Sequence, residues 1–533
     1  MRPVRSSAFL ALSLSVAAVG LTACGGGSDD NGGGGGSSKY ADGKTFTLVL
    51  ATDPGALDPQ SSPVSAAVQV AQFAYDALVH VDVKGEVQPQ LASKWTVDGN
   101  TVTFDIKDGV TCSDGSTFDA QTVADNLTYV GDPKNKSPYL GVYMPVGATA
   151  AASGSTVTLT LASPSPFVIN GLANLPMVCE SGLKDRASLK AGTAGTGPYT
   201  LKEAAPGDHY TYAVRKDYAW GPNGAKTSAE GTPATIEVKI VSNETTAANQ
   251  LISGEANAAQ ILGPDAKRLS GAQIKAVNTE IVTGEQWYNH AEGRVTNDPA
   301  VRMALTQSLD LAELQKVITS GTGGPATGLA ILAPAACPGD TVKGNVPATD
   351  TSAAAAALES AGYAKGADGV YAKDGKKLSV TFLYDTVLGS GGSAAAELAA
   401  KAWKDLGVDV QAKGANTTNL QPILFGSGDW DIAWEPINVS SPDQIVPFYS
   451  GPTVKDGGTN FAGIQNADYE ASVKTAMGKA GTDGCDDWAT AEKALFKAAD
   501  VVPFANNVTP TFHKGADLEI SGWIVPTSIK MLG

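Results

Sequence analysis

The chain has 533 residues, of which 54 are acidic and 38 are lysine or arginine, so its formal net charge at pH 7 is −16. A surface that binds nucleic acid needs a basic stripe, and this acidic balance argues against a nucleic-acid partner. A body of roughly 500 residues after the N-terminal segment exceeds a single hydrophobic core, so we expect two or three domains.

Residues 1–23 have the pattern of a secretory signal peptide: Arg2 and Arg5 precede a short apolar run and a small-residue cleavage site. The tetrapeptide Leu-Thr-Ala-Cys, ending at Cys24, resembles the lipobox of bacterial lipoproteins, which implies cleavage before Cys24 and its acylation. Residues 24–38 are almost entirely glycine and serine, as in a flexible tether. We therefore expect a lipid-anchored body at the extracytoplasmic face of the cell membrane. The alternative is an ordinary signal peptide with an accidental cysteine.

Four cysteines remain in the body: Cys112, Cys179, Cys337 and Cys485. An even number in an oxidising compartment predicts two disulfides, for which three pairings are possible. We favour Cys112–Cys179 and Cys337–Cys485, because each pair then lies inside one candidate domain. The sequence has no Cys-x-x-Cys, and its four histidines are widely scattered, so we expect no metal site and no cofactor.

The first half of the body contains short strands and capped helices. Residues 45–51 alternate as in a strand, and residues 52–59 form a loop rich in turn signals. Asp98-Gly99 between two alternating runs predicts a hairpin over residues 93–107. Asp119 can cap a helix whose apolar positions are Val123, Leu127 and Val130.

The second half of the body has the pattern of an α/β protein. Asp298 and Asp310 each stand at the start of a predicted helix, the first with proline at its first helical position. A strand is predicted over residues 378–384, a glycine-rich loop over 389–393 and a helix over 394–406, before a further strand. A strand, a helix and a parallel strand form a right-handed crossover unit.

Several passages, in order along the chain, resemble the family 5 solute-binding proteins of ABC importers, the oligopeptide, dipeptide and nickel group. Each passage alone is modest, but together their order and spacing are specific. They are Asp-Gly-Val through Ser-Asp-Gly to a helix start over residues 108–126, Gly-Thr-Gly-Pro-Tyr over 195–199, Asp-Pro-Ala-Val-Arg-Met-Ala-Leu over 298–305, the helix ending at Gly362-Tyr363, and Leu-Gly-Val over 406–408.

The resemblance implies an α/β, two-lobed periplasmic-binding-protein-like fold (class II, family 5 type) with an extra inserted subdomain and a ligand cleft between the lobes. The implied domains are lobe I over 39–72, 192–283 and 501–533, the inserted subdomain over 73–191, and lobe II over 284–500. Each favoured disulfide then lies within one of these parts.

The resemblance also indicates where a ligand binds. Trp287, Tyr288 and Asn289 stand where the chain enters lobe II, although Trp287 alternatively belongs to the core. In peptide-binding members an Asp near residue 438 pairs with the peptide amine. This chain has Ile437 and Asn438 there.

Further ligand candidates surround that position. They are Trp434, Glu435 and Asp443. Either Glu435 or Asp443 replaces the missing Asp as the partner of an amine, or the ligand has no amine. The alternative for Glu435 is a surface carboxylate. Peptide is the leading ligand class, with a sugar, an opine-like compound or a metal chelate left open.

Two loops add weaker candidates. Ser390 opens the predicted helix after the glycine-rich loop, where unpaired backbone N–H groups attract a carboxylate or phosphate. The alternative is a merely flexible surface loop. Asp53 and Leu57 belong to the loop after the first strand, which we expect to face the cleft, unless its residues serve turn geometry alone.

The sequence lacks the motifs of common enzymes: no Gly-x-Ser-x-Gly, His-Glu-x-x-His or complete P-loop occurs. We therefore expect a binding protein rather than an enzyme. It captures a peptide or similar small solute, works as a monomer and delivers the solute to the membrane permease of an ABC importer. The alternative function is an extracellular peptide-signal sensor of the same fold without net import.

Overall fold

The computed structural model describes residues 39–62 and 64–533. The predicted signal peptide, Cys24 and the tether lie outside the described residues. Residues Tyr40–Gly533 form one compact unit. In the described part of the chain, no helix combines the length and apolar character needed to cross a membrane.

One ten-stranded sheet organises this unit, with the strand order β17-β16-β18-β12-β19-β11-β1-β10-β9-β8. Its strands are β1 (Thr45–Leu50), β8 (Tyr199–Ala205), β9 (His209–Val214), β10 (Thr235–Ile240), β11 (Ala258–Gln260), β12 (Lys275–Tyr288), β16 (Ser379–Asp385), β17 (Asp409–Ala415), β18 (Ile432–Trp434) and β19 (Val501–His513).

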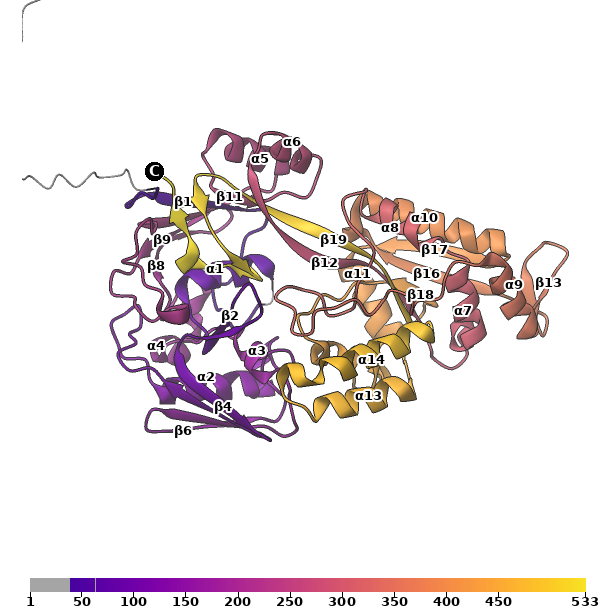
Figure 1. Ribbon diagram of the computed structural model, residues 1–533, viewed down its shortest axis with the longest axis horizontal. Coiled ribbons are helices and arrows are strands. Elements are labelled where there is room, and N and C mark those ends of the chain that lie inside the picture. The colour runs from indigo at the N-terminus through magenta and orange to yellow at the C-terminus, as the bar shows by residue number, and fades with distance from the viewer. Residues whose placement is uncertain (1–38, 63) are drawn as a thin grey trace, which may run out of the picture. The chain divides into compact units, whose positions relative to one another are not determined.

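Two long strands, β12 and β19, join the two ends of this sheet (Figure 1). They pair antiparallel from Lys275 opposite His513 to Trp287 opposite Val501, with a register shift on each side of Gly284. At one end β19 pairs with β11, and at the other end β12 pairs with β18. We call the part built on β11, β1, β10, β9 and β8 lobe I, and the part built on β18, β16 and β17 lobe II.

Lobe I packs α1 (Ser65–Ala74) on its sheet, where Phe73 contacts Tyr212 with ring centroids 5.7 Å apart. The helices α5 (Glu244–Ser253) and α6 (Asp265–Gly271) cover a second, smaller core. The C-terminal residues add two small sheets, made of β20 (Ala516–Asp517) with β23 (Lys530–Met531) and β21 (Ile520–Ser521) with β22 (Trp523–Ile524).

Residues in the predicted inserted subdomain have their own sheet and core. The sheet order is β4-β5-β7-β6, and Asp98 pairs with Thr101 across the hairpin turn that the sequence predicts. The elements are β2 (Val79–Val81), β3 (Val87–Pro89), β4 (Ala92–Asp98), β5 (Thr101–Ile106), β6 (Thr149–Ser153), β7 (Thr156–Thr160), α2 (Ala120–Gly131), α3 (Val168–Leu172) and α4 (Glu180–Lys184).

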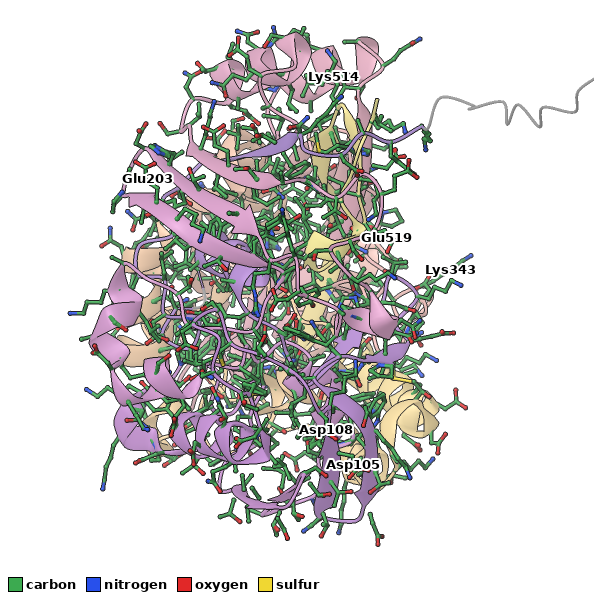
Figure 2. All side chains as sticks on the ribbon, turned by 90° about the vertical axis from the view of Figure 1, so that its left-hand side faces the viewer. Asp105, Asp108, Glu203, Lys343, Lys514 and Glu519 are labelled. Carbon is green, nitrogen blue, oxygen red and sulfur yellow. A yellow bond between two sulfur atoms is a disulfide. The ribbon has the colours of Figure 1, made fainter. Side chains whose placement is uncertain are left out.

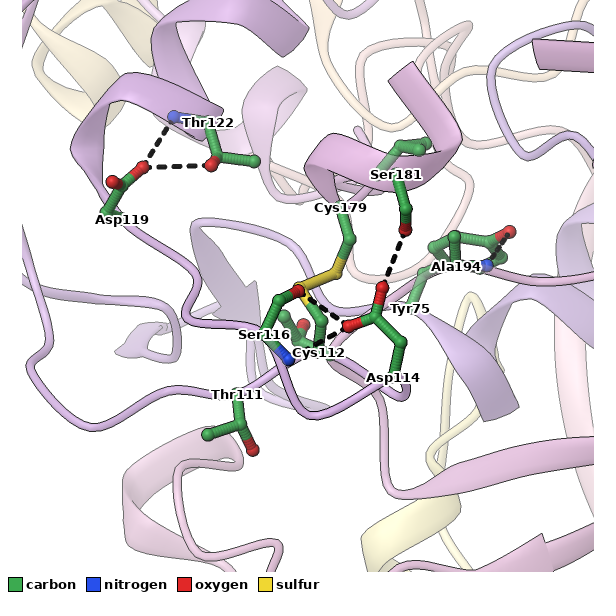
Figure 3. Close-up of a disulfide and its surroundings, with 12 residues drawn as sticks. Tyr75, Thr111, Cys112, Asp114, Ser116, Asp119, Thr122, Cys179, Ser181 and Ala194 are labelled. Atoms are coloured by element: carbon green, nitrogen blue, oxygen red, sulfur yellow. Dashed lines mark hydrogen bonds between the residues drawn. A yellow bond between two sulfur atoms is a disulfide. The ribbon is translucent and has the colours of Figure 1, made fainter. Parts of the chain in front are cut away.

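The structure contains both favoured disulfides, Cys112–Cys179 and Cys337–Cys485. Figure 3 shows the first of them beside Asp114, which accepts hydrogen bonds from Ser116 and Ser181. The Cys112–Cys179 disulfide and the Asp114 carboxylate thus both connect the loop before α2 to the start of α4. In the same view Asp119 caps α2, as its sequence position predicts.

Lobe II is an α/β layer around the parallel pair β16 and β17, which confirms the predicted crossover unit. Asp298 and Asp310 cap α7 and α8 through their side chains, as predicted. The antiparallel helices α13 and α14 lie side by side (Figure 1). The helices are α7 (Pro299–Gln307), α8 (Leu311–Ile318), α9 (Thr351–Ser360), α10 (Gly389–Leu406), α11 (Thr417–Pro422), α12 (Val446–Tyr449), α13 (Ala467–Met477) and α14 (Cys485–Lys497), and a small sheet is formed by β13 (Ala364–Lys365), β14 (Tyr371–Lys373) and β15 (Lys376–Lys377).

The predicted glycine-rich loop over residues 389–393 is wrong, because α10 already begins at Gly389. Packing explains the difference. A Cβ atom at Gly391 would lie 2.7 Å from the carbonyl oxygen of Ile318, so the helix start meets the end of α8 at a distance that only glycine permits. Tertiary contact thus overrides the low helix propensity of glycine.

Exposed charged side chains of both signs occur in several segments of the chain. Figure 2 labels six exposed examples from strands and loops: Asp105, Asp108, Glu203, Lys343, Lys514 and Glu519.

Candidate functional site

A cavity of about 840 Å³ lies beside the two strands that join the lobes. Thr279 and Ile281 of β12, together with Thr509 and Thr511 of β19, form part of its wall. Its volume is in the range of pockets that enclose small ligands. The remaining wall comes from lobe I (Thr52, Gln69, Gln260, Trp523), from the predicted inserted subdomain (Tyr143, Asn170, Asn174) and from lobe II (Leu332, Pro334, Asn438, Ser440, Gln444).

Asp76 is a buried carboxylate at the cavity wall, and its oxygens are occupied by the protein itself. It accepts hydrogen bonds from Gln90 (2.7 Å), Thr196 (2.9 Å), Tyr218 (2.9 Å) and Trp220 (3.1 Å). Burial raises the pKa of this carboxyl group, and the four donors oppose that effect. Asp76 therefore ties α1 to the segment around Tyr218.

Glu244, the second acidic residue of the wall, is also engaged. It stands at the start of α5 and accepts hydrogen bonds from the backbone N–H groups of Leu262 and Gly263. Its carboxylate thus holds the loop that follows β11. His80 lines the same cavity, and burial lowers its pKa, so its imidazole is uncharged near neutral pH.

Asn438 connects the lobe II wall of the cavity to β12. Its side-chain oxygen accepts from Val282 N at 2.8 Å, and its nitrogen donates to Val282 O at 3.1 Å. The side chain thus takes the place of a neighbouring strand at the point where β12 is irregular. The neighbouring Ile437 N donates to Glu285 Oε2 at 2.8 Å. Together these bonds hold the segment 437–438 against the strand that joins the lobes.

Two glutamates lie close to this segment, Glu285 buried and Glu435 half-buried. Glu285 has no exposed surface and accepts a hydrogen bond from the hydroxyl of Tyr449. Burial raises its pKa to about 8, and repulsion by Glu435 adds to the effect. The pKa of Glu435 rises to about 7, again mainly through burial and then through repulsion by Asp385. Gln421 donates to Glu435 Oε1 at 3.3 Å.

The three aromatic candidates from the sequence lie inside lobe II and do not border the cavity. Trp287 stacks on Tyr449 with centroids 4.6 Å apart, and its indole N–H donates to the carbonyl of Glu435. Trp434 donates to Gln286, and Tyr288 bonds to Thr306. All three are fully buried. This packing supports the alternative that Trp287 belongs to the core, and Tyr288 and Trp434 are packed in the same way.

The remaining candidates also have structural partners. Asn289 donates to the carbonyl of Trp430, and Asp443 accepts from Ser441. Asp53 accepts from the N–H groups of Gly55 and Gly207 and from Tyr210, which favours a role in turn geometry. Leu57 is buried in the core of lobe I, and Ser390 is exposed in the first turn of α10. Of the ten ligand candidates, Asn438 is the one that the described structure places at the cavity wall.

Sequence reasoning missed the polar residues that do line the cavity, such as Gln69, Asn170, Gln260 and Trp523. They come from four separate segments and belong to no motif. Only the strands β12 and β19 carried a sequence signal for the cavity. Side chains alternate between the two faces of a strand, so one face of a strand that joins two lobes is expected to border the cleft. Among the described residues, no group of three or more His, Cys, Asp or Glu side chains is placed to hold a metal ion.

Two lobes joined by a pair of crossing strands, with a cavity at the junction, define the class of two-lobed solute-binding proteins. Residues 86–457 match the family model described as bacterial extracellular solute-binding proteins, family 5 Middle. The chain belongs to this family.

Two individual relatives match part of this chain at 29% identity. Protein XP55 of Streptomyces lividans is 29% identical over 377 residues, which cover 66% of this chain and 63% of the relative. The glutathione-binding protein GsiB of Escherichia coli (strain K12) is 29% identical over 283 residues, or 51% of this chain and 53% of the relative. The chain therefore matches less than two thirds of the length of either protein.

A solved structure extends the likeness to nearly the whole chain. It is a substrate binding protein from Microbacterium hydrocarbonoxydans complexed with 4-hydroxybenzoate hydrazide. It is 26% identical to this chain, with a TM-score of 0.69, and the match covers 92% of this chain and all of that structure.

Proposed function

We propose that this protein is the extracytoplasmic substrate-binding component of an ABC importer. It captures a peptide or similar small solute between its lobes and delivers it to the membrane permease. The observation that carries this proposal is the cavity beside β12 and β19, which has walls from both lobes. Family membership supports the same function, and the chain acts by binding rather than catalysis.

The crossing strands supply the mechanism. A ligand that contacts both lobes favours the closed arrangement by its differential affinity for that state. The register shifts around Gly284 interrupt the regular pairing of β12 with β19, and such irregularities are points where a strand pair bends. We infer that closure bends the pair there, next to the contact between Asn438 and Val282.

The ligands named for relatives support a small solute. One relative is named a glutathione-binding protein, and one solved relative holds 4-hydroxybenzoate hydrazide. Both ligands are small enough for a cavity of about 840 Å³.

The attachment to the membrane is part of the proposal. Acylation of Cys24 would anchor the protein, since each buried methylene contributes about 0.8 kcal/mol and two or more chains hold firmly. The tether over residues 24–38 would leave the body, a monomer, free to reach the permease. Mass spectrometry of the protein from its own host should show a diacylated or triacylated Cys24 as the first residue.

Capture of a solute is tested with the mature protein purified from its own host. Native mass spectrometry should detect a bound small molecule. Thr509→Trp places a bulky ring in the cavity and should abolish that added mass. Thr96→Trp, on the exposed face of β4, makes the same change away from the cavity and should keep it. Equal loss in both variants, or equal retention, would contradict the assignment of the cavity.

Delivery to a permease is tested in the host. Uptake of the identified solute should stop when this gene is deleted, return with the normal chain, and stay absent with Thr509→Trp. A strain that keeps full uptake without the protein would refute the import function even if binding is confirmed.

A further inference from the structure

The cavity wall has no lysine or arginine among the described residues, its carboxylates accept hydrogen bonds from the protein, and some of its amide side chains lack partners. These features together restrict the class of substrate that the cavity can bind. Resting on the proposed function, we propose that the cleft selects an uncharged solute that carries several hydroxyl or amide groups, such as a neutral oligosaccharide or a peptide with blocked ends. An ionised carboxylate, phosphate or ammonium group on the solute is disfavoured.

The first observation concerns cations. Within the part of the chain that the structure describes, no lysine or arginine lines the cavity. An anionic solute enclosed between the lobes would lose hydration without gaining an ionic partner, and such burial is costly.

The second observation concerns anions. The two carboxylates of the wall, Asp76 and Glu244, already accept four and two hydrogen bonds from the protein. These bonds occupy both oxygens of Asp76 and one oxygen of Glu244. A cationic solute would have to compete with these donors at both oxygens of Asp76 and at Oε1 of Glu244.

The third observation concerns what the wall offers instead. The side chains of Asn170 and Gln260 line the cavity and make no hydrogen bond to any residue that the structure describes. Gln69 points its oxygen at the N–H of Ile524 (3.1 Å), which leaves its Nε2 as a buried donor without a partner at the wall. An amide group both donates and accepts, which matches hydroxyl and amide groups of a neutral solute.

Aromatic rings complete the wall. Tyr143 and Trp523 border the cavity together with His80. Rings of this kind bury the flat apolar faces of a ligand while the amides bond to its polar edge. The combination of rings and free amides is thus suited to an amphipathic, uncharged molecule.

The inference is tested on the mature protein with two matched probe pairs. The first pair is cellotriose and cellotrionic acid. The second pair is N-acetyl-trialanine amide and N-acetyl-trialanine as the free acid. Calorimetry at pH 7 should give the neutral member of at least one pair a tenfold or greater advantage in affinity. The pair that binds distinguishes a sugar from a peptide.

Any solute that is released on denaturing protein purified from the host provides a second readout. We expect a compound without an ionised group at pH 7. An anionic or cationic compound, or an acid probe that binds as tightly as its neutral partner, overturns the inference and leaves the proposed function standing. A bare protein that binds none of the four probes counts against the proposed function, and the inference falls with it.

A charge added to the wall tests the physical reason. Gln260→Arg should raise the affinity for the acid member of the binding pair about tenfold relative to the neutral member. Gln121→Arg adds the same charge on exposed α2, outside the cavity, and should leave that ratio unchanged. An unchanged ratio in Gln260→Arg, with an unaltered melting temperature, would show that local charge does not govern selection.

Discussion

Replacing Glu285 by Gln should remove a pH-dependent loss of stability. The carboxyl group has no exposed surface, and burial raises its pKa from an ordinary value of 4.5 to about 8. The unfolded chain loses this proton near pH 4.5, whereas the folded protein holds it until about pH 8. Stability from this site is therefore complete below pH 4.5 and falls as the pH rises through about 8.

The size of the effect follows from the two pKa values. The gap between 4.5 and about 8 corresponds to a loss of ~5 kcal/mol once Glu285 is fully ionised, and about 3 kcal/mol of it is lost by pH 7. The neutral amide keeps an acceptor for Ile437 N, and its NH2 group donates to the hydroxyl of Tyr449, which then accepts instead of donating. The variant therefore retains the contacts without the titration.

Scanning calorimetry of both proteins from pH 4 to pH 9 measures the difference. At about 2.1 cal/mol/K per residue, a chain of this size changes its melting temperature by about 1 °C per kcal/mol. The advantage of Glu285→Gln should therefore grow by about 3 °C between pH 4 and pH 7. Glu519→Gln, at an exposed site, is the control and should show no such growth. A constant difference across this range would refute the reasoning.

Three further changes have defined outcomes. Arg302→Leu should destabilise lobe II by about 3–5 kcal/mol in urea unfolding, because it leaves the buried carboxylate of Asp500 (3.0 Å away) without its ionic partner, and a smaller loss in the double variant with Asp500→Leu should confirm this cause. Cys337→Ser should cost about 2–5 kcal/mol, since the disulfide to Cys485 closes a loop with a sequence separation of 148 residues, and the same loss should appear in the normal protein after reduction. Asn438→Ala should cost about 1–3 kcal/mol, because it removes two hydrogen bonds to the backbone of β12, and an unchanged unfolding midpoint would mean that water replaces the side chain.

Local signals were sufficient to predict much of the fold. Asp298 and Asp310 predict helix starts, because an N-cap side chain bonds to a backbone N–H group within three residues of its own position. The Asp98-Gly99 turn fixes a hairpin for the same reason. The helix start at Gly389 was not predictable in this way, because its cause is the distant end of α8.

The residues that line the cavity were even harder to predict from local sequence. Gln69 and Gln260 are far apart in the sequence and line the same cavity only after lobe I has folded. No motif in the sequence around either residue distinguishes it from a glutamine on the surface. Trp287, by contrast, stands out in the sequence as a large aromatic residue near a lobe junction, yet it stacks on Tyr449 inside lobe II. Residue type alone does not distinguish a core tryptophan from a ligand contact.

The strand pair β12 and β19 has a consequence for the order in which the protein assembles. In lobe I, β11 lies between β1 near the start of the body and β19 near its end, so this sheet is complete only when the last strand has emerged. Lobe II draws β16, β17 and β18 from one stretch of chain and needs fewer distant partners. Because contacts distant in sequence form slowly, lobe II should gain protection against hydrogen exchange first during refolding, and the docking of β19 should close lobe I and create the cavity in a single late step.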